Sequence, residues 1–408
     1  MIEPVALWPP ERQHALKRLR AFVPQAGHLY AKQRYFDFGP GKHGKVSRLS
    51  PWLRHRVITE QEVLKTTLDS HTQTEAEKFI QEVFWRGYFK GWLEHRPDVW
   101  RYYKSDLVEL TDRLEKEAGL ARQYETATSG ETGIACFDAW ATELVETGYL
   151  HNHARMWFAS IWIFTLKLPW QLGADFFYRH LLDGDPASNT CSWRWVGGLH
   201  TIGKTYLARA DNIEKFTAGR FSPREQLAST AIALEDNRPV QLLAPKFNNA
   251  ELEGRRFGLL VTEEDCHPES LGVSNPSSIL ILLTATPRSV LPLGKLSAEF
   301  APSVLNASRG RIEKHFCVET ITTEENDWSI AISEWMREND LKVCVTSHLP
   351  LGPVAKRVKS AARASGVELI ERTRAYDQLT WRHAKKGFFG LKKKIPSILA
   401  DLNLRAHG

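Results

Sequence analysis

Residues 183–195 read DGDPASNTCSWRW, and residues 147–156 read TGYLHNHARM. Both stretches combine turn-forming residues with charged and aromatic side chains inside an otherwise helical region. A glycine between two carboxylates marks a turn and allows a close approach of the backbone. Three more motifs precede these two: SRLSP at residues 47–51, WRGYF at 85–89 and GETG at 130–133. The interpretation of the first half of the chain depends on these five motifs taken in order.

The first half, residues 9–220, has helical periodicity. It predicts helices at 10–22, 60–69, 74–94, 134–147, 150–168 and 173–182, joined by short turns. Thr74 followed by Glu77 is the pattern of a capping box that starts the third of these, and Pro97 ends it. We therefore expect a helical domain over residues 1–235.

The pattern changes after a polar stretch at residues 235–239. Short β-branched or apolar runs predict strands at 258–262, 278–284, 317–321, 342–347 and 367–370, with helices at 327–339 and 352–365 between them. Alternating strands and helices favour a parallel sheet, so we expect a Rossmann-like α/β domain over residues 240–408. No GxGxxG or GxxxxGK[ST] motif assigns a nucleotide to it.

The composition is that of a soluble globular protein: 42% of the 408 residues are hydrophobic and 25% are charged. Ser160, Thr165 and Lys167 interrupt the longest apolar run, so no segment reaches the length of a membrane span. The N-terminus lacks the basic and apolar regions of a signal peptide. We expect no membrane contact.

Five cysteines, an odd number without a CxxC pair, argue against a disulfide framework and against a clustered metal or iron–sulfur site. A reducing cytoplasm fits this pattern. The formal net charge of +6 suits a polyanionic partner, although that excess alone is weak evidence. Of the 14 tryptophans, 11 lie at or before Trp195, which singles out the first half for a use of indole area or redox chemistry.

Together the five motifs resemble the FAD-binding domain of the photolyase and cryptochrome family, over roughly residues 28–220. The resemblance implies a multidomain fold in which an all-helical, photolyase-type FAD-binding domain is followed by the Rossmann-like parallel α/β domain. Typical members place an α/β antenna domain first, and their opening motif is absent here. An antenna chromophore therefore stays unassigned.

The resemblance implies an FAD site built from three segments. The serines of the SRLSP motif and the backbone N–H groups at the start of a short helix would hold the diphosphate. The implied contacts are Tyr30, Val46, Ser47, Arg48, Leu49, Ser50, Arg155, Asp183, Gly184, Asp185 and Asn189. A serine-rich helix cap and an ordinary Asp-Gly-Asp turn are the alternatives when each motif is read alone.

Within this set, the resemblance pairs Arg155 with Asp183, which would create an electrostatic pocket for the reduced flavin. Asp185 would accept from the flavin or its ribityl chain. Asn189 would face flavin N5, where an amide hydrogen-bonds without titrating. The alternative for Asn189 is a cap on local backbone.

Two tryptophans match the family's electron-relay chain: Trp193, nearest the flavin, and Trp170, the middle member. The third member is unassigned, because Ala127 stands where one family tryptophan would be and Trp100 is only a guess. Ordinary core packing is the alternative for aromatic residues at these spacings.

Glu82, Trp85, Arg86 and Phe89 share one face of the helix predicted at 74–94. The resemblance implies that Glu82 binds the thymine edge of a cyclobutane dimer, Trp85 stacks on the lesion and Arg86 holds the backbone. The alternative is an i,i+4 surface pair between Glu82 and Arg86.

Four residues complete the implied lesion site. Trp195 matches a second stacking indole and Met156 another wall of the cavity for a flipped dinucleotide. Asn152 is the residue of enzymes for cyclobutane dimers, whereas enzymes for (6-4) products carry histidine there. His153 replaces a family arginine, so one contact would be weaker or pH-dependent.

The resemblance therefore implies a deoxyribodipyrimidine photolyase-like lyase. FADH⁻ would absorb light and donate an electron to a flipped dimer in DNA, and the electron would return after the ring opens. A cryptochrome-like blue-light photoreceptor without repair activity is the alternative. We expect a monomer whose partner is DNA containing pyrimidine dimers. Lys385, Lys386, Lys392, Lys393 and Lys394 could contact DNA, with an ordinary lysine-rich surface as the alternative.

Overall fold

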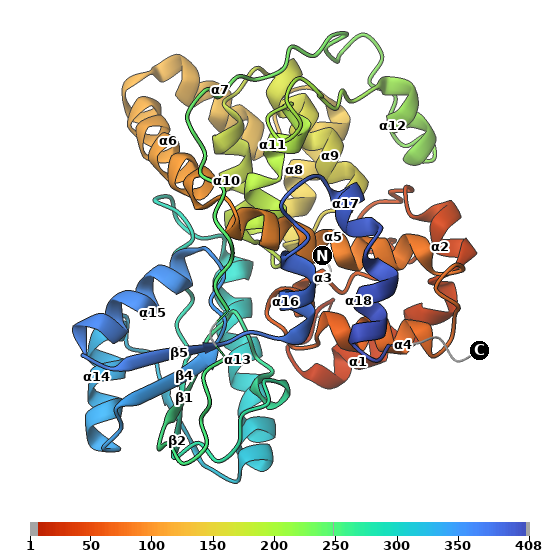
Figure 1. The fold of residues 1–408 in the computed structure, drawn as a ribbon. Helices are drawn as coiled ribbons and strands as arrows, with labels where there is room; N and C mark the ends of the chain where they lie inside the picture. Colours follow the sequence, from red (N-terminus) through yellow and green to blue (C-terminus); the bar gives the residue numbers. More distant parts are fainter. Residues whose placement is uncertain (1–6, 248, 405–408) are drawn as a thin grey trace.

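The computed structural model describes residues 7–247 and 249–404. Its first part is helical throughout, with twelve α-helices between residues 12 and 216 (Figure 1). They are α1 (Arg12–Phe22), α2 (His28–Gln33), α3 (Ser50–Arg54), α4 (Glu60–Leu68), α5 (Glu77–Glu94), α6 (Pro97–Lys116), α7 (Ala118–Ser129), α8 (Ala135–Thr147), α9 (Asn152–Ser160), α10 (Trp170–His180), α11 (Trp193–Val196) and α12 (Ala210–Phe216).

The start of α5 differs from the prediction. The reciprocal capping bonds join Thr72 and Glu75, in the turn before the helix, and not Thr74 and Glu77. Pro97 does end the predicted helix, but it is also the first residue of α6, where its missing N–H costs nothing. The helix predicted at 150–168 is α-helical only to Ser160 and then continues as a π-helical turn, Ile161–Thr165.

Five parallel strands form one sheet in the order β3-β2-β1-β4-β5. They are β1 (Gly258–Val261), β2 (Ser278–Leu282), β3 (Thr320–Thr323), β4 (Val343–Ser347) and β5 (Glu368–Arg372). The strand predicted at 317–321 begins later, because α13 (Lys295–Phe316) runs up to Cys317, whose left-handed backbone ends it. Three long helices were not predicted: α6 and α7, and α13, whose pattern is interrupted by an internal proline, Pro302.

The two faces of the sheet belong to different cores. Leu260 and Leu280 face α14 (Trp328–Glu338) and α15 (Pro353–Ala364) in a separate cluster. Their chain neighbours Leu259 and Ile279 point the other way, toward α13, because side chains alternate along a strand. That second core is continuous with the core of the helical part, so the sheet is joined to the helices through packed side chains.

The chain returns to the helical part after the last strand. Helices α16 (Ala375–Trp381), α17 (Phe388–Lys392) and α18 (Ile395–Asp401) follow the sheet, and α16 and α17 pack against α5 while α18 packs against α16 (Figure 1). A Cβ atom at Gly87 would lie 2.8 Å from the Tyr376 hydroxyl, and one at Gly91 would lie 2.8 Å from Cα of Trp381. These two glycines of α5 therefore make the close approach of α16 possible.

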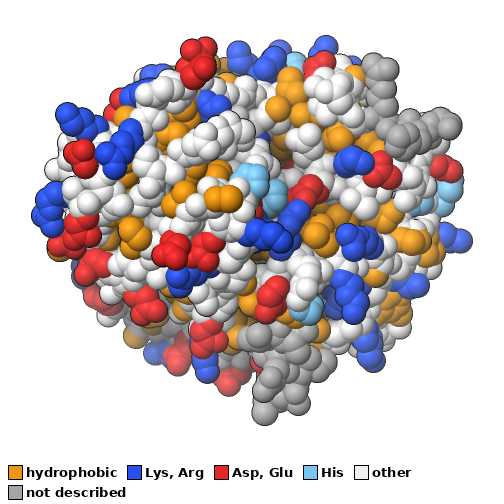
Figure 2. All heavy atoms as spheres, turned by 90° about the horizontal axis from the view of Figure 1, so that it is seen from below, with side chains coloured by type: hydrophobic (Ala, Val, Ile, Leu, Met, Phe, Trp, Pro, Cys, Tyr) orange, Lys and Arg blue, Asp and Glu red, His pale blue; other side chains and the backbone are white. Residues whose placement is uncertain are grey.

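Seen from below, the surface mixes acidic and basic side chains around small hydrophobic areas (Figure 2). All five cysteines are unpaired. Within residues 7–247 and 249–404, no helix has the length and apolar character needed to cross a membrane.

Candidate active site

Arg155 and Asp183 form a bidentate ion pair. Arg155 Nη1 donates to Asp183 Oδ2 at 2.9 Å, and Nη2 donates to Oδ1 at 3.1 Å. Burial alone would raise the pKa of Asp183, but the Arg155 guanidinium and the Ser50 hydroxyl bring it below its ordinary value. The carboxylate is therefore ionised at neutral pH, and the pair joins α9 to the turn that follows α10.

Asp185 shapes that turn from the inside. Its Oδ1 accepts from the backbone N–H groups of Ala187 at 2.9 Å and Ser188 at 2.8 Å, which caps the π-helical turn Pro186–Cys191. Its Oδ2 lies 3.5 Å from Nζ of buried Lys90 on α5. Despite burial, Lys90, Arg86 and Arg54 hold the pKa of Asp185 well below its usual range. Lys90 is a member of this cluster that sequence reasoning missed.

Asn189 is half-buried, and its Nδ2 donates to the Asp183 carbonyl at 2.7 Å. This is the local backbone contact considered as the alternative role for Asn189. The contact orients the amide within the same turn as Asp183 and Asp185. Its role toward flavin N5 stays a prediction.

The SRLSP segment is held from behind by two side chains. Arg18 donates from Nε to the Ser47 carbonyl and from Nη2 to the Val46 carbonyl, both at 2.8 Å. The Trp8 indole donates to the carbonyl of Arg48, at 3.0 Å, and Arg48 has a left-handed φ of 56°. Ser47 and Ser50 stay half-buried, while Leu49 is fully buried in the core.

Tyr30 lies in an aromatic cluster of the core. Its ring meets Phe22 and Phe79 edge-on, with ring centroids 5.8 and 5.3 Å apart. Only 7% of Tyr30 is exposed, so any FAD contact would be limited to a small part of the side chain.

The loops after the first two strands support the Asp183–Asp185 turn. Arg54 Nε donates to the Gly184 carbonyl at 2.6 Å, and its two Nη atoms donate to the Glu264 carboxylate at 2.7 Å each. A Cβ at Gly184 would lie 2.3 Å from Nη1 of Arg288, so this position has no room for a side chain. Parallel sheets of this kind bind ligands at the carboxyl ends of their strands. Here the end of β1 is engaged by Arg54 instead.

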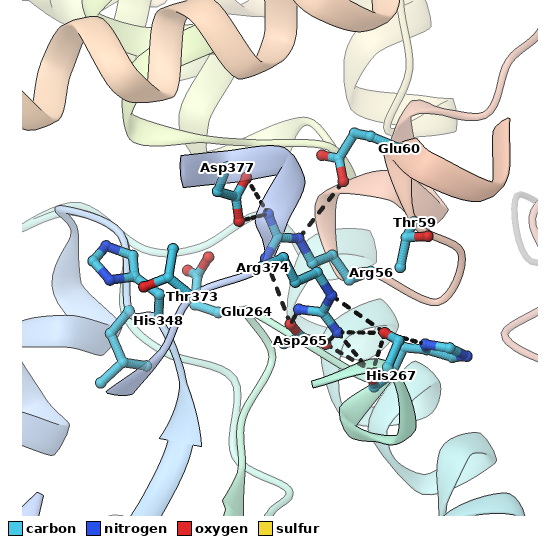
Figure 3. Close-up of polar contacts among 12 residues, drawn as sticks. Arg56, Thr59, Glu60, Glu264, Asp265, His267, His348, Thr373, Arg374 and Asp377 are labelled. Atoms are coloured by element: carbon cyan, nitrogen blue, oxygen red, sulfur yellow. Dashed lines mark hydrogen bonds and ion pairs between the residues drawn. The ribbon is translucent and has the colours of Figure 1, made fainter. Parts of the chain in front are cut away.

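A second buried ionic cluster lies beside it, centred on Arg56 (Figure 3). Arg56 Nη2 donates to both carboxylate oxygens of Asp377, at 2.8 and 2.6 Å. It also lies 3.7 Å from Glu60 and 3.6 Å from Asp265, and Asp265 is paired with Arg374. The cluster joins α4, the loop after β1 and α16, three segments distant in sequence.

The lesion residues predicted on α5 have partners within the protein. Glu82 pairs with Arg34, and Arg86 lies 3.4 Å from Glu60, so the i,i+4 pair between Glu82 and Arg86 is not formed. Burial raises the pKa of Glu82 in spite of Arg34. Glu82 and Arg86 are thus held by side chains from outside α5.

Trp85 stacks on Phe388 of α17, with ring centroids 3.7 Å apart and an interplanar angle of 12°. On α5 itself it lies 5.7 Å from Phe89. One ring face of Trp85 is therefore covered by the C-terminal segment. A lesion could stack only on the other face while this contact persists.

Two predicted lesion residues line a pocket of about 440 Å³, His153 and Met156, together with Tyr35, Tyr206 and Phe216. The Trp195 ring stacks on Tyr206 at 5.4 Å, which places this indole next to the pocket. Neither Glu82, Trp85 nor Arg86 lines it. The predicted lesion residues therefore fall into two groups.

Asn152 is exposed at the start of α9, whereas its neighbour His153 is buried. His153 Nδ1 bonds the Tyr35 carbonyl at 3.0 Å, and burial lowers the pKa of the imidazole to about 4. At neutral pH His153 is uncharged, so it does not supply the positive charge of the arginine common at this position.

The predicted relay tryptophans lie in two aromatic clusters. Trp193 is buried edge-on to Trp162, 6.3 Å away, and a Cβ at Gly173 of α10 would lie 2.5 Å from its ring. Trp170, one turn before Gly173, is tilted against Tyr103 at 5.9 Å, and Tyr103 stacks on Trp100 at 5.2 Å. Ala127 is fully buried. Trp162 and Tyr103 are aromatic neighbours that motif comparison did not single out.

Asp37, His43 and Glu143 form another buried group missed from the sequence, with potential ligand atoms within 4.8 Å of one another. His43 Nε2 bonds Glu143 at 2.7 Å. Asp37 accepts from the Trp140 indole at 3.0 Å and from Arg220 at 2.9 Å. These bonds tie α8 to the loop before the SRLSP segment and account for the group as a structural one.

Residues 79–225 match the family model described as the FAD binding domain of DNA photolyase, so the protein contains a photolyase-type FAD-binding domain whose cofactor is FAD. Tyr30 and the SRLSP segment lie before the matched residues.

Three curated relatives are named deoxyribodipyrimidine photo-lyase. That of Thermus thermophilus is 34% identical over 198 residues, 48% of this chain and 45% of the relative. The Alkalihalophilus pseudofirmus protein is 29% identical over 199 residues (48% and 39%), and the Escherichia coli protein 28% over 206 residues (50% and 42%). The chain thus spans less than half the length of these relatives. A class III photolyase structure from Agrobacterium tumefaciens aligns with TM-score 0.42 and 26% identity, over 52% of this chain and 44% of that one.

The residues present fit an FAD. His151 Nδ1 accepts from the His153 N–H, so Nε2 carries the proton of the neutral ring, and this buried atom has no partner among the described residues. It offers an unused donor one turn before Arg155. Together with the Arg155–Asp183 pair and half-buried Ser47 and Ser50, it provides donors and positive charge for an anionic, hydrogen-bonding cofactor.

Proposed function

We propose that this protein is a light-driven, FAD-dependent lyase that repairs cyclobutane pyrimidine dimers in DNA. The observation that carries the proposal is the Arg155–Asp183 ion pair, in which Arg155 comes from α9. On the same helix, Met156 and His153 line a pocket. One short helix thus connects a flavin-binding pair to a cavity. The names of the curated relatives support the same activity.

In this proposal, bound FAD supplies the absorption of light and the electron that opens the dimer. The protein binds the flavin through the Asp183–Asp185 turn, Asn189, Ser47 and Ser50. Met156, Trp195 and Tyr206 form apolar walls that replace the base stacking lost when a lesion leaves the duplex. Asn152, exposed at the start of α9, hydrogen-bonds the lesion without a proton transfer.

In the same proposal, tryptophans relay the electron that reduces FAD under light. Trp193 packs against Gly173 of α10, Trp170 is the first residue of the same helix, and each has an aromatic neighbour. The protein acts in the cytoplasm, where its unpaired cysteines stay reduced.

One observation favours a second function, a blue-light receptor of the cryptochrome kind without repair. Trp85 is stacked on Phe388 and Glu82 is paired with Arg34, so two implied lesion contacts are engaged inside the protein. In a receptor, the flavin would be reduced by light and a partner-binding surface would respond.

The experiment that separates the two is a repair assay on the purified, FAD-loaded protein. Oligonucleotides carrying one cyclobutane dimer are incubated under blue light and in the dark, after chemical reduction of the flavin. Light-dependent restoration of the intact bases supports the lyase. Reduction of the oxidised flavin by light in a separate sample, without any restoration by the chemically reduced protein, supports the receptor, and a preparation that takes up no FAD contradicts both.

A further inference from the structure

The segment of residues 382–394, RHAKKGFFGLKKK, which we call the basic segment, is the most one-sided stretch of charge in the molecule's C-terminal part. It contains six Lys or Arg residues and no Asp or Glu, so its formal charge equals the net charge of +6 of all 408 residues. It lies outside residues 79–225, which match the FAD-binding family model. Its function is therefore not explained by that match.

The charges of the basic segment face solvent. Arg382, Lys385, Lys386, Lys393 and Lys394 are exposed and form no ion pair with any described residue. Lys392 is the exception, since it pairs with Glu77 of α5 at 3.1 Å. Phe389 is 73% exposed among these cations, although a phenylalanine side chain gains nothing from water.

The segment is fixed against α5. Phe388 stacks on Trp85, as described above, and the Tyr88 hydroxyl donates to the Lys386 carbonyl at 2.9 Å. Arg96 donates to the Lys385 carbonyl at 2.6 Å. Three side chains along α5 and its end therefore hold the backbone of the segment, and its lysines are left free to point outward.

We propose that the basic segment is a DNA-binding element: its lysines contact backbone phosphates, and Phe389 stacks on an exposed base beside the lesion. This deepens the proposed function and rests on it. Lysines that neutralise phosphates release counterions, which favours binding. An exposed aromatic side chain among cations is typical of proteins that bind single-stranded or locally opened nucleic acid. The covered face of Trp85 fits this arrangement, because Phe388 anchors the segment while Phe389 is presented to the DNA.

The test compares two variants with the same change in charge. The first carries K385Q, K386Q, K393Q and K394Q, and the control carries K116Q, K295Q, K314Q and K342Q, four exposed lysines on other surfaces. Fluorescence anisotropy with dimer-containing duplex is recorded over a range of KCl concentrations. The first variant should bind roughly 10- to 100-fold more weakly at moderate salt, and the slope of log Kd against log salt should fall by about 0.9 for each lost phosphate contact.

A third variant, F389A, should weaken binding about fivefold or more without changing the salt slope, because it removes stacking and not charge. Parental affinity in the first variant, or an equal loss in the control, would overturn the proposal. Retained DNA binding combined with lost binding to phosphatidylserine vesicles would overturn it in favour of a lipid surface.

The outcomes also separate this inference from the proposed function. A parent protein that binds DNA through the basic segment but never restores a dimer under light would leave the inference standing and remove the lyase. A parent protein that repairs dimers, combined with unchanged DNA affinity in the first variant, would leave the lyase standing and remove the inference. FAD content is measured in each variant to exclude an indirect loss.

Discussion

The guanidinium of Arg54 joins two distant parts of the protein, because it donates to the Glu264 carboxylate from both Nη atoms and to the Gly184 carbonyl from Nε. Arg54 ends α3, Glu264 follows β1, and Gly184 is the centre of the Asp183–Asp185 turn. All three groups are buried, so the α/β part stabilises the turn directly.

The change E264Q should test this contact. Removing one partner of a buried pair leaves an uncompensated charge, and we expect a loss of about 3 to 5 kcal/mol in the free energy of unfolding. FAD retention on gel filtration should fall with it, since Gly184 loses its fixed position. The matched control is E253Q at an exposed glutamate, which should change neither quantity. Unchanged FAD retention in a destabilised E264Q protein would contradict the link to the turn.

Phe388 should matter for folding and Phe389 should not. F388A removes a buried ring from its stack on Trp85 and should lower stability by about 3 kcal/mol, whereas F389A, at a 73% exposed position, should stay within about 0.5 kcal/mol of the parent. Urea unfolding monitored by tryptophan fluorescence measures both. Equal effects would show that the stack contributes nothing.

Glu82 should be needed for repair and not for the flavin. E82A leaves Arg34 without its partner and should slow dimer repair by roughly 10- to 100-fold, the loss expected when a hydrogen bond to a charged group is removed. E82Q keeps an acceptor for Arg34 and should keep more of the activity. Repair rates and FAD absorbance are compared for both variants, and parental rates in E82A would refute the assigned contact.

Trp193 and Trp162 should carry photoreduction together. W193F should impair reduction of FAD by light while repair by chemically reduced enzyme stays largely intact, and W162F should have a smaller effect of the same kind. W328F, a buried tryptophan on α14, is the control. Time-resolved absorption measures the yield of reduced flavin. A yield unaffected by W193F would exclude the relay.

Stability should fall in mild acid. Burial lowers the pKa of His153 and His200 to about 4 and of His151 to about 3, against 6.5 for an ordinary histidine. The folded state therefore binds fewer protons than the unfolded chain between these values, so this stability is complete above pH 6.5 and is lost as the pH falls toward 4. Each histidine should contribute a loss of up to about 2 kcal/mol between pH 7 and pH 5.

The measurement is urea unfolding at the two pH values. H153N removes one of these groups and should reduce the difference between them. A stability that does not change from pH 7 to pH 5 would show that these imidazoles titrate normally.

Local patterns were enough to predict the five strands and eight of the helices, but not the long helices α6, α7 and α13 or the C-terminal helices α16, α17 and α18. The five strands lie within a few residues of their predicted places, because short β-branched runs between polar segments have few other arrangements. Pro97 was predicted to end one helix but not to begin the next one, α6. The 22-residue helix α13 was not predicted because Pro302 lies inside it.

Most contacts between distant segments could not be predicted from local sequence patterns. The motifs led to the pairing of Arg155 with Asp183, which the structure contains. Nothing in the sequence near Trp85 indicates that Phe388 covers it, and nothing near Arg56 points to Asp377, because such contacts are decided by packing between segments more than 300 residues apart. Glu82 and Arg86, predicted to contact the lesion and the DNA backbone, were therefore found with partners that only the fold supplies.

The close fit of α16 against Gly87 and Gly91 has a consequence for biosynthesis. A ribosome makes α5 early, yet the groove on this helix is filled by residues that emerge nearly 300 positions later. Until those residues emerge, the face of α5 that carries Gly87 and Gly91 lacks its packing partner, so this early helix can complete its native contacts only when the chain is nearly finished.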